Sequence, residues 1–258
     1  MRFENQVAIV TGAGQGIGKG VAKLLAAEGA KVTGCDLVGE RIEATAREIR
    51  AAGGECLATV TDVTNERQVQ EMVDQTIAAF GRIDILINNV GGVFGLEKSL
   101  REISDDLWHK TLDVNLTSQF LCSRAVVPHM KRQGYGKIVN MSSLVGVRPK
   151  LSDALPYVAA KGAVLGLTRQ LAFELGPHGI NVNAIAHTDT ITERFYEQIE
   201  EASWPETVEE VRARHAQYPL GRPAEIEDVA RVVAFLASRA ADYVLGETMI
   251  VSGGNFMV

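Results

Sequence analysis

Tyr157 and Lys161 are the two residues whose types and spacing best suit proton transfer. Four residues apart on a helix, a phenol and an ammonium group share one face. A tyrosine normally titrates at about pH 10, and a neighbouring positive charge lowers its pKa by favouring the phenolate. A phenol tuned in this way can take a proton from an alcohol or return one to a ketone. The pair therefore predicts acid–base chemistry at a carbon–oxygen bond.

A serine lies where it could hold the substrate oxygen opposite this pair. Ser143 precedes Tyr157 by fourteen residues and follows the stretch 137–141, which predicts a buried strand. A tyrosine and a lysine four residues apart also arise by chance. The weight of the pattern therefore comes from its position just after a serine that ends a strand.

A glycine-rich turn near the N-terminus has the composition of a phosphate cradle. The segment 11–18, Thr-Gly-Ala-Gly-Gln-Gly-Ile-Gly, follows the apolar run 7–10 and precedes a helix predicted over 19–28. Glycine lets the backbone turn sharply and approach a ligand closely, and the helix directs free N–H groups at the turn. A pyrophosphate suits this place. The alternative is a glycine turn that binds nothing.

An acidic residue at the next strand end bears on the choice of cofactor. Asp36 ends the predicted strand 30–36 and lies 18 residues beyond Gly18. A carboxylate near that distance can accept hydrogen bonds from the ribose hydroxyls of an adenosine, and it would repel a 2′-phosphate. Because no arginine stands at 37 or 38, we predict NAD rather than NADP. A solvated aspartate is the alternative.

Two further strand ends are expected to face the same ligand. Asp62 and Val63 follow the strand 56–60 and are placed to pair with and cover an adenine. The strand 83–88 runs into a polar, flexible turn at 88–92, Asn-Asn-Val-Gly-Gly. Its two asparagines are also good turn formers, so a purely structural role stays open.

Strand and helix signals alternate along the whole chain, which predicts an α/β fold. Strands are expected at 7–10, 30–36, 56–60, 83–88, 137–141, 180–185 and 247–251, and helices at 19–28, 40–52, 65–80, 105–132, 156–175 and 225–238. Such alternation gives a parallel sheet with helices on both faces, and ligands bind at the carboxyl ends of its strands. Because no linker or repeat interrupts the pattern, we expect residues 1–258 to form one domain.

The bulk composition excludes several classes of protein. A net charge of −6 argues against a nucleic-acid binder, and no apolar run approaches the length of a membrane span. The N-terminus lacks the pattern of a signal peptide. The three cysteines are scattered and make neither a disulfide framework nor a metal cluster, so we expect a cytoplasmic protein with reduced thiols.

Taken together, these residues resemble the short-chain dehydrogenase/reductase family over essentially the whole chain. The resemblance rests on the glycine segment 11–18, Asp62-Val63, Asn88-Asn89-Val90-Gly91, Asn115, Ser143, Tyr157-Val158-Ala159-Ala160-Lys161 and Ile180-Asn181-Val182-Asn183. It implies a single-domain Rossmann fold with a seven-stranded parallel sheet in the order 3-2-1-4-5-6-7. It also implies NAD-dependent hydride transfer between a nicotinamide and the carbinol carbon of a secondary alcohol or ketone.

The resemblance implies roles for individual residues. Tyr157 would be the general acid/base, Lys161 would lower its pKa and bind the nicotinamide ribose, and Ser143 would orient the substrate oxygen. Asn115 would hold its helix and a water in a proton relay, the alternative being a buried asparagine satisfied by the backbone. The expected cofactor contacts are Gly12, Gln15, Gly16, Ile17, Gly18, Asp36, Leu37, Asp62, Val63, Asn89, Gly91, Tyr157, Lys161, Thr190 and Thr192. The expected substrate contacts are Ser143, Tyr157, Val145 and His187, and no metal site is expected.

The sequence departs from the family pattern at three places. Val90 stands where the family usually has alanine, and the interval from Ser143 to Tyr157 is one residue longer than expected. The Pro-Gly that normally follows the sixth strand and packs on the nicotinamide is replaced by His187-Thr188. His187 is therefore either a local structural residue or one that reaches the active site.

The segment at about 188–218 corresponds to the substrate lid of the family. It carries the aromatic residues Phe195, Tyr196, Trp204 and Tyr218. They suit an apolar or ring-containing substrate, or else they pack the lid onto the body. Arg148, Lys150 and Arg194 lie in segments that would line the pocket, where one of them could bind a carboxylate.

The predicted helix 156–175 bears on assembly, because it is apolar around most of its circumference and must be covered on several sides. We expect a second subunit to cover one face, in a homotetramer as the resemblance implies, with the region of Cys122 joining the interface. Two other functions stay open. One is a cis-dihydrodiol carboxylate dehydrogenase that yields a catechol, and the other is a non-catalytic dinucleotide-sensing protein on the same fold.

Overall fold

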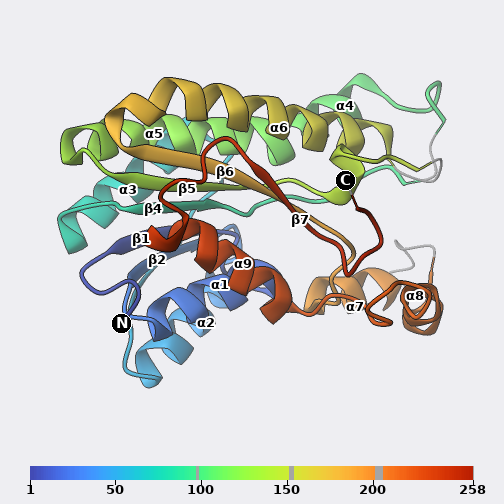
Figure 1. Cartoon of the computed structure of the whole chain (residues 1–258), viewed down its shortest axis with the longest axis horizontal. Coiled ribbons are helices and arrows are strands. Elements are labelled where there is room, and N and C mark those ends of the chain that lie inside the picture. Colours follow the sequence, from blue (N-terminus) through green and yellow to red (C-terminus); the bar gives the residue numbers. More distant parts are fainter. Residues whose placement is uncertain (97–98, 151–153, 201–205, 258) are drawn as a thin grey trace.

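The central feature of the computed structural model is a parallel sheet of seven strands in the order β3-β2-β1-β4-β5-β6-β7 (Figure 1). The strands are β1 (Val7–Thr11), β2 (Lys31–Asp36), β3 (Glu55–Val60), β4 (Ile85–Asn88), β5 (Gly136–Met141), β6 (Ile180–His187) and β7 (Thr248–Val251). The structure describes residues 1–96, 99–150, 154–200 and 206–257, without the side chains of 194, 198 and 200. The predicted fold class and strand order are confirmed.

Helices cover both faces of this sheet (Figure 1). The α-helices are α1 (Gly16–Ala27), α2 (Gly39–Ala51), α3 (Glu66–Phe80), α4 (Asp105–Leu112), α5 (Ser118–Gln133), α6 (Leu155–Leu175), α7 (Glu193–Glu200), α8 (Val208–His215) and α9 (Ile226–Ala237). Helices α1, α2 and α9 contribute to one apolar cluster, and α3, α5 and α6 contribute to the other. None of the helices within the described ranges is long and apolar enough to cross a membrane.

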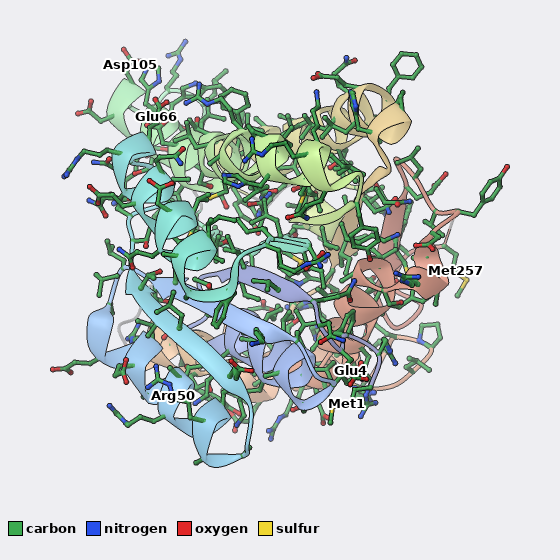
Figure 2. All side chains as sticks on the ribbon, turned by 90° about the vertical axis from the view of Figure 1, so that its left-hand side faces the viewer. Met1, Glu4, Arg50, Glu66, Asp105 and Met257 are labelled. Carbon is green, nitrogen blue, oxygen red and sulfur yellow. The ribbon has the colours of Figure 1, made fainter. Side chains whose placement is uncertain are left out.

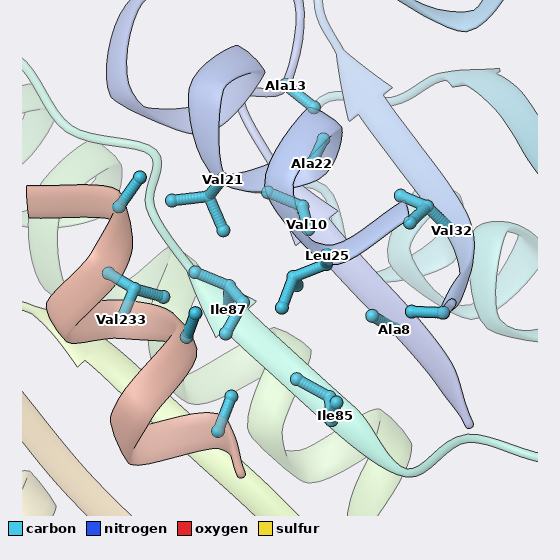
Figure 3. Close-up of a cluster of buried hydrophobic side chains, with 14 of the residues drawn as sticks. Ala8, Val10, Ala13, Val21, Ala22, Leu25, Val32, Ile85, Ile87 and Val233 are labelled. Atoms are coloured by element: carbon cyan, nitrogen blue, oxygen red, sulfur yellow. The ribbon is translucent and has the colours of Figure 1, made fainter. Parts of the chain in front are cut away.

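The apolar core forms because strand side chains alternate between the two faces. Val10 of β1 faces the α1 side while its neighbour Ile9 faces the α3 side, and both are fully buried. On α1, Val21 and Leu25 lie one turn apart and point at the sheet (Figure 3). Burying each such side chain contributes about 1.5–3 kcal/mol, so the sheet edge that carries the loops rests on a rigid base. Charged side chains such as Arg50 project from the periphery (Figure 2).

The long helix predicted over 105–132 is interrupted, which corrects that prediction. After α4 the backbone widens into a π-helical turn, Asp113–Thr117, before α5 begins. Turns of this kind are rare and often mark functional sites. The predicted start of α3 is confirmed, since Asn65 caps it by accepting from the backbone N–H groups of Arg67 and Gln68.

The described part of the lid segment contains two short helices, α7 and α8, at one end of the molecule (Figure 1). It follows β6, which runs to His187, two residues beyond the predicted end. Helix α8 begins with a capping box in which Thr207 and Glu210 satisfy each other's backbone N–H groups. Trp204 and the side chain of Arg194, both singled out from the sequence, lie outside the described part.

Candidate active site

Tyr157 and Lys161 lie on the first turns of α6, which Pro156 helps to begin. The Lys161 ammonium nitrogen is 5.5 Å from the centre of the Tyr157 ring. The side chain of Lys161 is buried, whereas Tyr157 is partly accessible. The geometry therefore places a cation beside a phenol that a substrate could still reach, as the spacing predicted.

Lys161 carries its charge without a carboxylate partner among the described residues. Its Nζ donates a hydrogen bond to the carbonyl oxygen of Met141, at 2.8 Å. Burial lowers the pKa of Lys161 from 10.5 to about 7, because a buried ammonium loses its hydration. The lysine therefore changes protonation near neutral pH, where its effect on Tyr157 matters.

Two adjacent serines follow β5 and have different surroundings. The Ser142 hydroxyl is fully buried and donates to the backbone carbonyl oxygen of Lys161, at 2.8 Å. Ser143 begins the loop with the short helix Leu144–Gly146, and its hydroxyl makes no hydrogen bond within the described chain. Ser142 thus ties β5 to α6, whereas the buried Ser143 hydroxyl takes no part in that link. Val145 lies half-buried on the same loop.

Asn115 sits in the middle of the π-helical turn and joins it to the turn after β4. Its Nδ2 donates to the carbonyl oxygens of Gly92 (2.9 Å) and Thr111 (3.0 Å), and its Oδ1 accepts from the Gly92 N–H at 3.0 Å. A Cβ on Gly91 would lie 2.8 Å from Asn115 Oδ1 and 2.9 Å from Lys161 Nζ, so these three residues meet. Asn115 thus fastens the π-helical turn to Gly92 and lies close to Lys161.

The glycine loop 11–18 is folded tightly on itself. A Cβ on Gly18 would lie 2.1 Å from the carbonyl oxygen of Gly12, so only glycine allows this packing. Asn89 braces the loop by donating its side-chain amide to the Thr11 carbonyl oxygen at 2.9 Å. The prediction of Asn89 as a cofactor contact did not anticipate this bracing role.

The N-terminus of α1 lies beside the lid. The backbone N–H of Gly16 donates to the Glu193 carboxylate at 3.0 Å, and Thr192 also lies against Gly16. Helix N-termini attract anions, and Gln15 supplies no side-chain cap. The compact glycine cradle and this helix end fit the pyrophosphate of a dinucleotide, with Ile17 on the first turn. Nothing in the local sequence indicated the contact with Glu193, which spans 177 residues.

Asp36 is held rigidly at the end of β2. One carboxylate oxygen accepts from the Gly14 N–H at 3.1 Å and the other from the Val38 N–H at 3.0 Å. Leu37 beside it is exposed. Arg41 on α2 lies near Asp36, across from Gly14, and its guanidinium pairs with Glu197 of the lid at 3.2 Å.

The residues after β3 are fixed by their own turn. Asp62 accepts from the backbone N–H of Thr64 at 2.9 Å and from its hydroxyl at 2.7 Å. Val63 is buried in the core cluster on the α3 side. Both residues follow β3 at the carboxyl edge of the sheet, where the ligand is expected.

His187 is the last residue of β6, and Thr188, Asp189 and Thr190 follow it in a turn. The His187 Nδ1 lies 2.8 Å from the Thr188 carbonyl oxygen, which fixes that nitrogen as the donor. The Thr190 hydroxyl donates to the same carbonyl at 3.2 Å. Burial lowers the pKa of His187, and the nearby charge of Lys161 lowers it further. His187 is thus tied locally and also close to the candidate catalytic lysine.

The aromatic and basic side chains that the sequence placed at the substrate pocket differ in how deeply they are buried. Phe195 is buried, as the packing alternative for the lid aromatics requires, whereas Tyr196 is exposed. The ring of Tyr218 packs edge-on against His215, with 4.6 Å between ring centres. Arg148 is exposed and lies 5.8 Å from the centre of the Phe256 ring.

A large hollow of about 1100 Å³ runs along the outer side of α1 between α2 and α9, and Gly16 and Glu193 belong to its lining. Asn115, Ser143, Tyr157 and Lys161 do not line it. Within the described residues, no group of three potential metal ligands comes together. The candidate site is therefore the carboxyl edge of the sheet, where these four residues and the glycine loop lie.

Comparison with known proteins covers nearly the full length of the chain. A family model described as enoyl-(acyl carrier protein) reductase matches residues 12–255. The chain is 39% identical over 260 residues to the (2S)-[(R)-hydroxy(phenyl)methyl]succinyl-CoA dehydrogenase subunit BbsD of Thauera aromatica, covering 99% of this chain and 98% of that one. It is 40% identical over 253 residues to the short-chain reductase protein NovJ of Streptomyces niveus, covering 98% and 94%. The solved structure of 7α-hydroxysteroid dehydrogenase complexed with NADH and 7-oxo glycochenodeoxycholic acid matches with a TM-score of 0.90 and 32% identity, covering 98% and 95%.

Proposed function

The chain belongs to the short-chain dehydrogenase/reductase family, and on that premise we propose that it transfers a hydride between NAD and a secondary alcohol or ketone. One observation carries the proposal. Lys161 lies beside both Tyr157 and Asn115, at the strand end from which the Ser143 loop departs. These residue types in that arrangement suit proton transfer at a carbinol oxygen.

Tyr157 is the general acid/base of the proposed reaction. In the direction of oxidation, its phenolate takes the hydroxyl proton of the substrate while the carbinol carbon gives up a hydride. Bound NAD⁺ supplies the hydride acceptor. Ser143 holds the substrate oxygen by a hydrogen bond. Lys161, when protonated, favours the phenolate, and Asn115 keeps the π-helical turn against Gly92 beside that lysine.

A comparison of two tyrosine variants tests this mechanism. We expect Tyr157→Phe to lower turnover by about 1000-fold, since it removes the proton carrier, while NADH binding stays unchanged. Tyr243→Phe is the matched control, because Tyr243 is fully exposed. Turnover is measured as NADH absorbance with a panel of chiral secondary alcohols. Unchanged turnover in Tyr157→Phe would contradict the assigned role, and a panel without any NAD-linked change would favour the dinucleotide-sensing alternative.

The choice of NAD over NADP is assigned to Asp36. Its carboxylate is fixed by the N–H groups of Gly14 and Val38, at the place where an adenosine ribose would end. We expect Asp36→Ala to weaken the binding of NAD. The ratio of kcat/KM for NADP to kcat/KM for NAD should rise by about tenfold. Asp106→Ala, at an exposed carboxylate on α4, is the control. A native preference for NADP would overturn the assignment.

Arg148 supports a narrower candidate, a dehydrogenase of cyclic dihydrodiol carboxylates. It lies on the loop that leaves Ser143, and no carboxylate pairs with it within the described chain. An arginine can bind a carboxylate through two parallel hydrogen bonds. A catechol product from a cis-dihydrodiol carboxylate would establish this activity, and activity confined to simple saturated alcohols would exclude it.

We further propose a cytoplasmic homotetramer in which α5 and α6 meet other copies. Phe173 on α6 is 84% exposed and Phe120 on α5 is 42% exposed, which is costly for aromatic rings in water. Cys122 itself is buried within its own subunit, so its side chain does not join this surface. The three cysteines are free and buried, as suits a reducing compartment. Light scattering of wild type and Phe173→Glu tests the assembly, and an unchanged mass in the variant would contradict it.

A further inference from the structure

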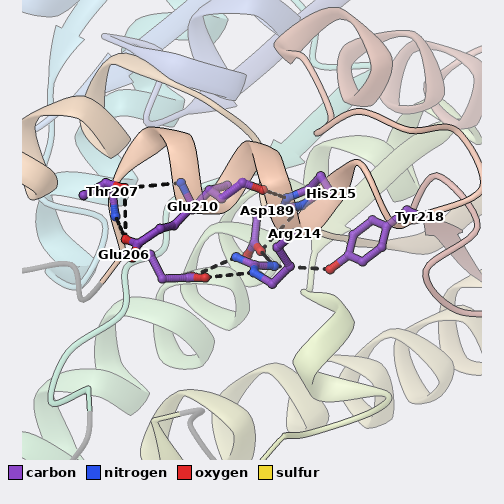
Figure 4. A network of polar contacts seen from close by, with 8 residues as sticks. Asp189, Glu206, Thr207, Glu210, Arg214, His215 and Tyr218 are labelled. Carbon is purple, nitrogen blue, oxygen red and sulfur yellow. Dashed lines mark hydrogen bonds and ion pairs between the residues drawn. The ribbon is translucent and has the colours of Figure 1, made fainter.

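Arg214 of the lid is the centre of a network of polar contacts (Figure 4). Its Nε and Nη2 donate to the two carboxylate oxygens of Glu206, at 2.9 and 2.8 Å. Its Nη1 donates to Asp189 at 2.8 Å and to the Tyr218 hydroxyl at 3.2 Å. One guanidinium therefore joins α8 to Asp189, which lies in the turn after β6. The hydrogen bonds to Glu206 and Asp189 raise the pKa of Arg214, although burial works against its charge.

Asp189 has one strong partner on the lid side. The Nε2 of His215 lies 3.7 Å from the same Asp189 oxygen, too far for a hydrogen bond. The His215 Nδ1 is bonded to the Val211 carbonyl oxygen at 2.7 Å, and its ring is fully buried. Helix α8 is thus a fixed support, and the Arg214 guanidinium is the group through which it holds Asp189.

The residues on either side of Asp189 form a turn at the carboxyl end of β6. The Thr188 carbonyl oxygen accepts from His187 and from the Thr190 hydroxyl, so the turn 187–190 is closed on itself. His187 ends β6 two residues beyond Ile185, which pairs with Met141 of β5, and the Met141 carbonyl oxygen accepts from Lys161 Nζ at 2.8 Å. Thr190 also pairs through the backbone with Ala224. Asp189 thus lies in a turn at the end of β6, and the neighbouring strand β5 carries the carbonyl oxygen that binds Lys161.

We propose that Arg214 is a positioning residue, which fixes the turn 187–190 for the nicotinamide end of the cofactor by holding Asp189 against α8. The inference rests on the proposed function, because that function places the nicotinamide beside this turn. The adenosine end is assigned to Asp36, whose described hydrogen bonds come from Gly14 and Val38 and not from the network. Loss of Arg214 should therefore weaken binding of the nicotinamide end alone.

The binding of two probes to Arg214→Met distinguishes an effect at the nicotinamide end of the cofactor from an effect at the adenosine end. NADH carries the nicotinamide, and ADP-ribose lacks it but keeps the rest of the dinucleotide. We expect the affinity for NADH to fall about tenfold, as for the loss of one or two hydrogen bonds, while ADP-ribose binding changes less than about twofold. Isothermal titration calorimetry measures both. Equal weakening of the two probes, or no change in either, would overturn the proposal.

Arg222→Met is the matched control. Arg222 also makes a two-point ion pair, with Asp228 on α9 at 2.5 and 3.0 Å, but it does not touch the turn 187–190. We expect this variant to bind both probes as wild type does. Arg214→Lys, which keeps the charge but cannot reach both carboxylates, should recover part of the NADH affinity.

Steady-state kinetics and a double variant give independent readouts. We expect Arg214→Met to raise the KM for NADH with a smaller effect on kcat, and Asp189→Asn to add little in the double variant, because both changes break the same link. Additive effects would overturn the assigned route through Asp189. The two proposals fail differently: a wild-type protein that binds neither probe would contradict the proposed function, whereas tight NADH binding by Arg214→Met would contradict only this inference.

Discussion

The body and the lid of the protein surround their cations in opposite ways. Lys161, in the body, is buried with a carbonyl oxygen as its hydrogen-bond partner, and burial lowers its pKa to about 7. Arg214, in the lid, is held by two carboxylates, and its pKa is raised. A desolvated cation without a counter-charge can change protonation, which suits chemistry. A cation fixed between carboxylates keeps its charge and its place, which suits positioning.

The same contrast extends to how each region is packed. The body rests on two apolar clusters that run along the sheet. The described contacts that fasten the lid include the carboxylate of Glu193 on Gly16, the pair of Glu197 with Arg41, and Arg214 with Asp189. Apolar burial does not respond to salt or pH in the way that ion pairs do. The lid should therefore move under conditions that leave the body intact.

The buried Lys161 should make the free energy of unfolding depend strongly on pH. Between its folded pKa of about 7 and its ordinary value of 10.5, Lys161 binds fewer protons when the protein is folded, so its contribution to stability improves as pH rises. Relative to Lys161→Met, the free energy of unfolding of wild type should rise by about 2 kcal/mol from pH 7 to pH 9. Urea unfolding at each pH measures this, and parallel pH curves for the two proteins would contradict the lowered pKa.

Two valine-to-alanine variants, one in the body and one in the lid, compare how much the packing of each region contributes to global stability. Val21 on α1 and Val211 on α8 are both fully buried, and only Val21 belongs to one of the apolar clusters of the described residues. We expect Val21→Ala to lower the free energy of global unfolding by about 2 kcal/mol. Val211→Ala should leave it nearly unchanged and instead speed proteolysis within the lid. If both variants lower global stability equally, the lid unfolds together with the body.

The sequence predicted the strands and helices because apolar runs and glycine turns are local signals, whereas the order of the strands was implied by the resemblance to the family. It predicted the nearness of Tyr157 and Lys161 because they lie on one helix. It missed the π-helical break around Asn115, whose bonds reach Gly92, 23 residues away. The link from Arg214 to Asp189 spans 25 residues and involves charges that any exposed helix could carry. Such contacts are set by tertiary packing, which leaves no local pattern.

High salt should have the smallest effect, confined to the lid. The side chains of Arg214, Asp189 and Glu206 are each about a third exposed (28%, 36% and 35%), so solvent screens their attraction. We expect 1 M NaCl to speed hydrogen exchange of the α8 amides by about two- to fivefold, with no change in α1. Mass spectrometry of exchange in both helices measures this. If salt accelerated hydrogen exchange equally in α1 and α8, the lid would not depend on ion pairs more than the body does.

Transfer of deuterium from labelled NADH tests the proposed hydride transfer most directly. A panel of ketones is incubated with the protein and with NADH deuterated at either face of nicotinamide C4. Mass spectrometry then measures the deuterium content of the alcohol products. We predict one deuterium on the carbinol carbon, from one face only, with wild type, and negligible product with Tyr157→Phe. An alcohol product without deuterium from either face, or undiminished labelled product from Tyr157→Phe, would contradict the assignment.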